Sequence, residues 1–308
     1  MTIAFISHEA CTLHAMGLGH PERPERLGAI QDRLIASGME HAVQVFDAPA
    51  VTREQLLRVH TADHIDFLAN HVPADGLVWI DGDTAINPHT LEAASRAAGA
   101  AVLGVDLVLG RQVESAFASV RPPGHHAERR RAMGFCFFNN VAIGAAHAIH
   151  AWGLERVAIV DFDVHHGNGT EDIFWDEPRV LFCSSFQHPL FPYSGTEPRG
   201  EGIVNIPLPA YTTGAQYMAN VLAQWGSAID AFKPQLILIS AGFDAHGEDE
   251  LAQLRLTDDD YRTITAEVKR LADRHCNGHV VSVLEGGYAL SALGRSAVTH
   301  LDALLGHY

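Results

Sequence analysis

The stretch IVDFDVHHGNGT, residues 159–170, joins an apolar run to four titratable side chains. β-Branched residues before a polar segment are typical of a buried strand that ends in a loop. Asp163 and His165 stand two positions apart, so on an extended chain their side chains point to the same face. A carboxylate oxygen and an imidazole nitrogen suit zinc, and a catalytic zinc usually has three protein ligands and one open position. The stretch therefore predicts part of a metal site, although an isolated pair of this kind more often caps the following helix.

Outward from this stretch, apolar strands alternate with helical patterns along the chain, and polar motifs follow the strands. This order predicts one α/β domain over residues 1–308, with a mainly parallel sheet, helices on both faces and a site at the carboxyl ends of the strands. Besides the strand at 159, we expect strands at residues 2–6, 115–120, 179–184, 235–240 and 280–284. We expect helices at residues 25–38, 59–69, 89–109, 140–151, 214–232 and 257–275, with Asn140 capping the fourth, and a last helix at the end of the chain.

The composition restricts the class of partner. The 308 residues are 47% apolar and carry a net charge of −16, which argues against a nucleic-acid surface and is compatible with a cationic substrate. The four cysteines form no CxxC pair and lie far apart, so neither a cysteine zinc site nor a disulfide framework is indicated. No basic start and no apolar run of about 18 residues is present. We therefore expect a soluble cytoplasmic protein with no membrane or nucleic-acid partner.

Two histidines, His60 and His64, stand at i and i+4 in a helical pattern. Such a pair binds zinc in the HExxH motif, but the glutamate of that motif is missing here. We interpret this pair as structural. The small residues of the helix at 89–109, including Gly99 and Gly104, indicate close packing rather than chemistry.

Four predicted strand ends carry reactive side chains. His125 and His126 follow the strand at 115–120, Asp244 follows the strand at 235–240, and Tyr288 follows the last strand. In a parallel sheet these ends meet the Asp163 loop at one rim, which brings together three metal ligands and a pair of bases.

Five motifs, in this order, resemble the zinc-dependent histone deacetylase family. They are RPPGHH (121–126), GFCFFNN (134–140), DFDVHHGNGT (161–170), SAGFDA (240–245) and EGGY (285–288). The segment HPERPERL (20–27), the asparagine at Asn168 and the short EGGY motif resemble the class II branch and its bacterial histone deacetylase-like amidohydrolase relatives. The resemblance implies the fold shared with arginases and a single histone deacetylase-like catalytic domain over residues 1–308.

The resemblance also implies a role for each site residue. Asp163, His165 and Asp244 would be the zinc ligands, a set that leaves a position for water and for a carbonyl oxygen. His126, held by Asn168, would be the base that deprotonates the water and then the acid that protonates the leaving amine. Iron(II) could compete with zinc at such a site in the cell.

Further roles concern charge and the substrate channel. His125, paired with Asp161, would be mainly electrostatic, because an aspartate raises the pKa of a neighbouring imidazole more than an asparagine does. Tyr288 would donate a hydrogen bond to the developing oxyanion. Phe135 and Phe191 would form the walls of the acyl channel, with the carbonyl of Gly134 facing the substrate amide. By resemblance alone, a structural potassium ion would be held by Asp161, Asp163, His165, Ser184 and Ser185.

The substrate class depends on one loop. Polyamine-selective relatives carry a glutamate gatekeeper at the position that an ungapped alignment gives to Leu251, and Glu250 stands beside it. We favour an acylated lysine peptide or protein over an acetylpolyamine. Asp81 or Asp83 is a candidate to fix a substrate backbone, with a solvated acidic loop as the alternative.

Three other interpretations have weaker support. Gly167 and Gly169 follow a strand and open a helix, but the third glycine of a nucleotide-binding motif is missing. A serine hydrolase lacks its GxSxG elbow here. A pseudoenzyme that binds acylated ligands is the non-enzymatic alternative, although every catalytic position of the family is filled.

Overall fold

The computed structural model describes residues 2–197 and 199–307. Its centre is an eight-stranded sheet in the order β2-β1-β5-β10-β9-β6-β7-β8. Every neighbouring pair is parallel, so the sheet is wholly rather than mainly parallel. Its strands are β1 (Ile3–Ser7), β2 (Val43–Asp47), β5 (Ser115–Ala118), β6 (Val157–Asp161), β7 (Val180–Gln187), β8 (Ile203–Leu208), β9 (Leu236–Ala241) and β10 (Val280–Leu284).

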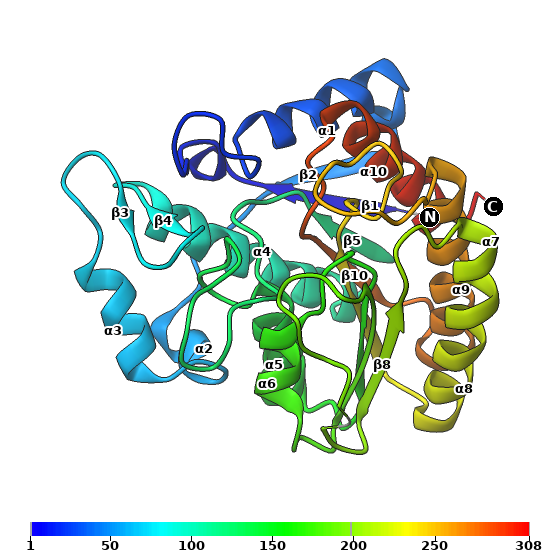
Figure 1. Cartoon of the computed structure of the whole chain (residues 1–308). Helices are drawn as coiled ribbons and strands as arrows, with labels where there is room; N and C mark the ends of the chain where they lie inside the picture. The colour runs from blue at the N-terminus through cyan, green and yellow to red at the C-terminus, as the bar shows by residue number, and fades with distance from the viewer. Residues whose placement is uncertain (1, 198, 308) are drawn as a thin grey trace.

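Helices cover both faces of this sheet (Figure 1). On one face α4 (Thr90–Leu109) and α5 (Asn140–Trp152) pack together and against the strands. On the other lie α1 (Glu25–Ala36), α8 (Ala223–Phe232), α9 (Asp258–Cys276) and α10 (Leu290–Leu304). The expected α/β architecture is confirmed. The remaining elements are η1 (Glu9–Thr12), η2 (Met39–His41), α2 (Arg53–Leu57), α3 (Ala62–Asn70), the hairpin of β3 (Val78–Trp79) and β4 (Ala85–Ile86), α6 (Asn168–Phe174), α7 (Gly214–Tyr217) and the π-helical turn η3 (Met218–Leu222).

The interior is closely packed. All residues of β6, β9 and β10 are buried, as expected of strands covered on both faces. A Cβ on Gly99 would lie 1.8 Å from the carbonyl oxygen of Pro49, and one on Gly104 would lie 2.9 Å from Cγ1 of Val281. The close packing predicted for these glycines is confirmed.

The local predictions failed at the sheet edges and at one cap. Both edge strands, β2 and β8, were not predicted. They carry polar residues, and β8 contains Pro207, which has no N–H for a ladder and is tolerated in an edge strand. The cap of α5 is Asn139, whose side chain accepts from the N–H of Ala142, and not Asn140, whose amide donates to the carbonyl of Pro122.

The order of the strands creates the site. The chain leaves β6 for β7 on one side and later enters β9 on the other, so the loops after β6 and β9 diverge and leave a crevice between them. Next to β9 lie β10 and then β5, whose loops carry Tyr288 and the pair His125 and His126. In the described part of the chain, no helix has the length and apolar character that crossing a membrane requires.

Candidate metal centre and active site

Three side chains converge where the loops after β6 and β9 diverge. One ligand atom from each of Asp163, His165 and Asp244 lies within 4.8 Å of the other two. Nδ1 of His165 is 3.0 Å from Oδ1 of Asp163 and 3.2 Å from Oδ2 of Asp244. Two carboxylates and one imidazole suit zinc and leave a coordination position open.

Backbone groups orient both carboxylates. The N–H of Gly286 donates to Oδ2 of Asp163 at 2.8 Å, and the N–H of Val164 donates to Oδ1 of Asp244 at 3.0 Å. Oδ2 of Asp244 is buried and finds no hydrogen-bond donor among the described residues. A buried oxygen of this kind costs free energy unless a partner satisfies it, and a cation coordinated there would do so.

The electrostatics of these three side chains favours a cation. Burial would raise the pKa of Asp163, but the charges of His125 and His165 hold it below its usual range. Burial and the charge of Asp163 raise the pKa of Asp244 to about 6. Burial would lower the pKa of His165, yet its hydrogen bond to Asp163 and the nearby carboxylate of Asp244 raise it to about 10. Two buried carboxylates beside one imidazole thus form a site that is complementary to a positive charge.

The two histidines after β5 lie beside this candidate metal triad, with ring centroids 4.0 Å apart and ring planes tilted by 42°. Nδ1 of His125 lies 2.9 Å from Oδ2 of Asp161, and Nδ1 of His126 lies 2.7 Å from Oδ1 of Asn168. The predicted pairing of each histidine with its partner is present.

The charges of these two histidines differ. Burial would lower the pKa of His125, but Asp163 and Asp161 outweigh it and raise that pKa well above its usual value. Burial and the charges of His125 and His165 lower the pKa of His126 well below its usual value. The two pKa shifts have opposite directions, which is the direction of difference that the pairing of His125 with Asp161 and of His126 with Asn168 implies.

Aromatic rings border the approach to these residues. Phe191 packs edge-on against His126 at 5.1 Å, and Phe135 lies edge-on to Tyr288 at 6.1 Å between ring centroids. Gly134 has φ +55°, and a Cβ there would lie 2.6 Å from Cδ2 of His126, so only glycine fits between these groups. Its carbonyl, predicted to face a substrate, accepts a weak bond from Sγ of Cys136 at 3.3 Å.

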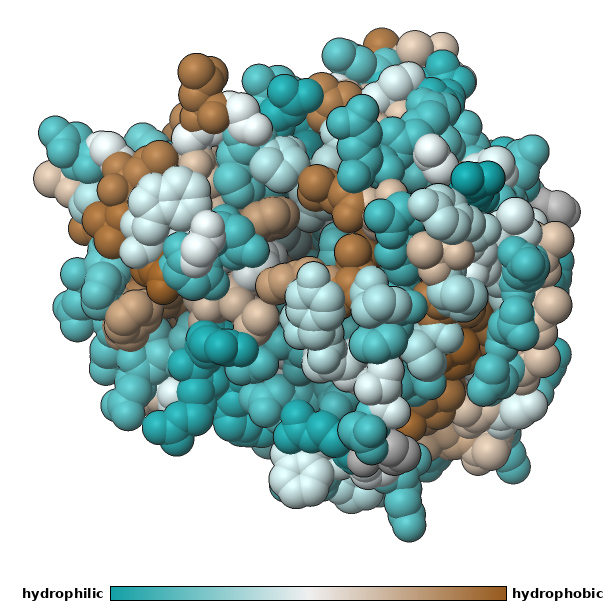
Figure 2. All heavy atoms as spheres, in the orientation of Figure 1, coloured by the Kyte–Doolittle hydropathy of each residue, from teal (hydrophilic) through white to brown (hydrophobic). Residues whose placement is uncertain are grey.

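Tyr288, Leu251 and Glu250 line a cavity of about 330 Å³, together with His20 and Arg23. The candidate gatekeeper Leu251 and its acidic neighbour therefore both face the same space. This side of the molecule is hollowed near its middle, and apolar groups lie along part of the rim (Figure 2).

The other predicted residues lie nearby. Oδ1 of Asp81 accepts from the N–H groups of Asp83 and Thr84, and Oγ1 of Thr84 accepts from the N–H of Phe135 at 3.1 Å. This acidic loop is therefore linked through Thr84 to Phe135, the residue predicted to form a channel wall. Oγ of Ser184 is buried without a hydrogen-bond partner among the described residues, while Oγ of Ser185 bonds the hydroxyl of Tyr217.

The pair His60 and His64 is structural, as expected. Nδ1 of His60 bonds the carbonyl of Glu128 at 3.0 Å, and Nε2 of His64 bonds the carbonyl of Phe137 at 2.9 Å. The two rings hold the loop after His126 rather than a metal.

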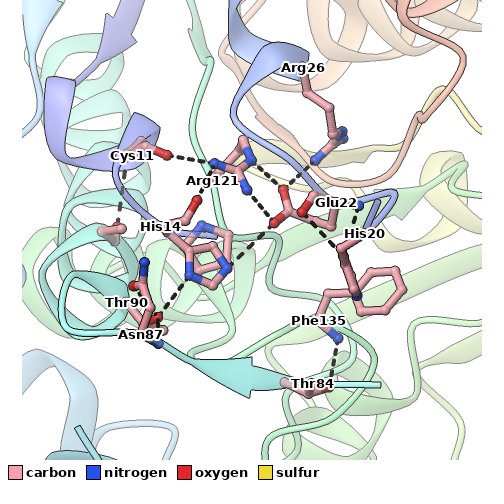
Figure 3. A network of polar contacts seen from close by, with 12 residues as sticks. Cys11, His14, His20, Glu22, Arg26, Thr84, Asn87, Thr90, Arg121 and Phe135 are labelled. Atoms are coloured by element: carbon pink, nitrogen blue, oxygen red, sulfur yellow. Dashed lines mark hydrogen bonds and ion pairs between the residues drawn. The ribbon is translucent and has the colours of Figure 1, made fainter. Parts of the chain in front are cut away.

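A buried network of charged side chains lies next to Tyr288, and we did not predict it from the sequence (Figure 3). The carboxylate of Glu22 binds the guanidinium of Arg121 through both oxygens and that of Arg26 at 3.0 Å. Arg26 donates to the carbonyls of Gly287 and Glu285 and lies 5.0 Å from the ring of Tyr288. The sequence signal for this network was the presence of charged residues in the motifs HPERPERL, RPPGHH and EGGY. Charged side chains are buried only when they are paired, so these residues could have been expected to bind one another.

Replacing Glu22 with glutamine is expected to lower the free energy of unfolding by about 3 kcal/mol, because two buried guanidinium groups lose their counter-charge. Burial would raise the pKa of Glu22, but Arg121, His14 and Arg26 hold it well below its usual value. This stabilisation is complete above about pH 4.5, the unfolded-state value, and is lost as the pH falls toward the folded-state pKa.

Urea unfolding of both proteins at several pH values measures this difference. The surface pair of Glu92 and Arg96 supplies the control, and Glu92→Gln should cost less than about 1 kcal/mol. Equal losses for the two variants at neutral pH would contradict the structural role of Glu22.

Comparisons with known proteins agree with this geometry. The histone deacetylase domain model matches residues 20–304. The histone deacetylase-like amidohydrolase of Pseudomonas aeruginosa is 38% identical over 310 residues, which cover 93% of this chain and 81% of that protein. Polyamine deacetylase HDAC10 of Homo sapiens is 37% identical over 327 residues, covering 99% of this chain and 48% of that protein.

Comparison with a solved structure supports the same family at the level of the fold. The crystal structure of the HDA15 HD domain superposes with a TM-score of 0.92 at 32% sequence identity. The match covers 100% of this chain and 90% of that one. The chain therefore belongs to the histone deacetylase family, whose activity is deacetylation by amide hydrolysis.

Proposed function

We propose that this protein is a zinc-dependent deacylase that hydrolyses the amide of acetyl-lysine or a related short acyl-lysine. The proposal rests on the convergence of Asp163, His165 and Asp244, where Oδ2 of Asp244 is buried without a hydrogen-bond partner in the described part of the chain. When bound, zinc supplies Lewis acidity, which polarises the acyl carbonyl and lowers the pKa of water.

The side chains around the triad perform the proton transfers. His126 is neutral and bonds Asn168 through Nδ1, so its Nε2 is free to take a proton from the attacking water and to return it to the leaving amine. His125, charged and paired with Asp161, stabilises the negative charge of the tetrahedral intermediate.

Tyr288 donates a hydrogen bond to the oxygen that becomes negative. Burial raises the pKa of Tyr288 well above its usual value, so the hydroxyl keeps its proton and remains a donor. The N–H groups of Tyr288 and Ala289 donate to Oδ2 of Asp249 at 2.7 and 3.0 Å, which fixes the backbone of this residue.

A structural potassium ion is part of the same proposal. The hydroxyl of Ser184 has no hydrogen-bond partner among the residues that the structure describes, and it would supply one oxygen ligand from β7, beside Asp161 of β6. Asp163, His165 and Ser185 would supply the remaining ligands, mainly through backbone carbonyls, which suit a hard cation.

Acetylpolyamine is the second candidate substrate. Glu250 lines the same cavity as Leu251 and Tyr288, and a carboxylate at that place would attract a cationic chain. A relative at 37% identity is named a polyamine deacetylase. The apolar Leu251 at the gatekeeper position favours acyl-lysine over this alternative.

A side-by-side rate comparison separates the two substrates. We expect kcat/KM for an acetyl-lysine peptide to exceed that for acetylated putrescine and spermidine, with all turnover lost in a zinc chelator. Glu250→Gln should leave the peptide rate unchanged. A preference for the polyamines that Glu250→Gln abolishes would instead make Glu250 the gatekeeper and reject the acyl-lysine proposal.

A further inference from the structure

Glu128 contacts the amide that holds the proposed base. It lies two residues after His126, and its side chain is 27% exposed. Nδ2 of Asn168 donates to Oε1 of Glu128 at 2.8 Å and reaches Sδ of Met133 at 3.4 Å. The side chains therefore form one hydrogen-bonded chain that runs from His126 through Asn168 to Glu128.

This hydrogen-bonded chain determines which way the amide points. An asparagine amide has a donor end and an acceptor end, whereas an ionised carboxylate only accepts. With Nδ2 on Glu128, Oδ1 faces Nδ1 of His126 at 2.7 Å. Nδ1 must then carry the hydrogen, and Nε2 of the neutral ring keeps its lone pair.

The opposite amide orientation would be unproductive. It would place Oδ1 of Asn168 against the carboxylate of Glu128 and a donor against Nδ1 of His126. The neutral ring would then carry its hydrogen on Nε2 and could not accept a proton there. An aspartate at position 168 would not have this problem, because both of its oxygens accept.

We propose that Glu128 is a positioning residue: it fixes the amide of Asn168 and thereby selects the tautomer of His126 that acts as a base. The proposal rests on the proposed deacylase function. This role also explains why a glutamate lies beside the active site although it is neither a proposed metal ligand nor a proposed base.

The surroundings hold Glu128 in place. Its N–H donates to the carbonyl of Arg131 at 2.9 Å. Nε2 of His60 accepts from the N–H of Asn139 at 2.9 Å, so Nδ1 of His60 is the donor to the carbonyl of Glu128. The structural histidine His60 thus fixes the backbone of the positioning residue.

The side chain of Glu128 also borders open space. Together with Asn168 and Met133 it lines a cavity of about 350 Å³. Water can fill the volume that a truncated side chain leaves there, so Glu128→Ala is expected to fold. Glu197 lines the same cavity and provides a matched glutamate control, Glu197→Ala.

The test is a double-mutant cycle in the zinc-loaded protein. Glu128→Ala should lower kcat for the acetyl-lysine peptide by about tenfold with little change in KM, because part of the enzyme then holds the wrong tautomer. In an Asn168→Asp background, the same substitution should cause no further loss or a gain, because an aspartate needs no orientation and the two carboxylates repel. Glu197→Ala should leave kcat unchanged.

Two results would overturn the proposal. The first is an equal loss of kcat on Glu128→Ala in the Asn168 and Asn168→Asp backgrounds, which would indicate a general structural effect. The second is no loss of kcat on Glu128→Ala in the Asn168 background. An inactive wild-type protein would reject the proposed function instead. In that case ¹⁵N NMR of the imidazoles still tests the positioning role, with His126 protonated at Nδ1 in the wild type and mixed in Glu128→Ala. An unchanged tautomer in the variant would overturn it.

Discussion

Replacing Asp244 with alanine is expected to remove bound zinc and turnover together, with a rate loss of at least about 10³-fold. Only Asp163 and His165 would remain, and two protein ligands do not hold a catalytic zinc. The lost carboxylate is also the group whose Oδ2 lies buried and unbonded in the described structure.

The measurement is zinc per chain after dialysis, together with the peptide rate. Asp244→Asn retains an oxygen that can accept from the N–H of Val164, so it separates the loss of charge from a loss of fold. Asp176→Ala, an exposed aspartate, should keep both zinc and rate. A zinc-loaded and active Asp244→Ala protein would disprove the ligand set.

Replacing Tyr288 with phenylalanine should leave zinc binding intact and lower kcat by about 10² to 10³-fold, the usual effect of removing one oxyanion donor. The backbone bonds to Asp249 and the packing of the ring against Arg26 and Phe135 do not involve the hydroxyl. The substitution therefore removes one hydrogen-bond donor and little else.

Steady-state kinetics and metal analysis check this result. Tyr211→Phe is the control, because that ring is 60% exposed and packs under Arg255. A Tyr288→Phe protein that keeps more than about a tenth of kcat would show that its hydroxyl does not stabilise the transition state.

The fold and the candidate metal triad could be predicted because apolar strands alternate with helices along the chain and polar motifs follow the strands. The strands β9 and β10 are mostly apolar, so their limits were predicted to within one residue, and each is followed by polar residues of one rim. Because parallel strands end at the same rim, Asp163, His165 and Asp244 could be grouped although the third is distant in sequence.

The edges and the supporting residues were not predictable from local patterns. An edge strand such as β8 is not continuously apolar, and its pairing with β7 depends on the whole sheet. The bond between Glu22 and Arg121 joins residues 99 positions apart, and no periodicity encodes it. The same holds for Glu128 and Asn168, whose contact exists because the loop after His126 meets the first turn of α6.

The sequence also did not decide which residue of one loop would contact the substrate. Leu251 and Glu250 are neighbours in sequence, and both line the cavity beside Tyr288. Which of these two side chains would meet a substrate depends on the conformation of their loop, which spacing alone does not specify.

A zinc titration of the metal-free protein tests whether hydrolysis depends on one zinc ion held by Asp163, His165 and Asp244. Bound zinc per chain and hydrolysis of an acetyl-lysine peptide are measured on the same samples. We expect turnover to be absent without metal, to rise in proportion to occupancy and to reach its maximum at one zinc per chain. Full turnover in the metal-free protein would contradict this dependence on zinc.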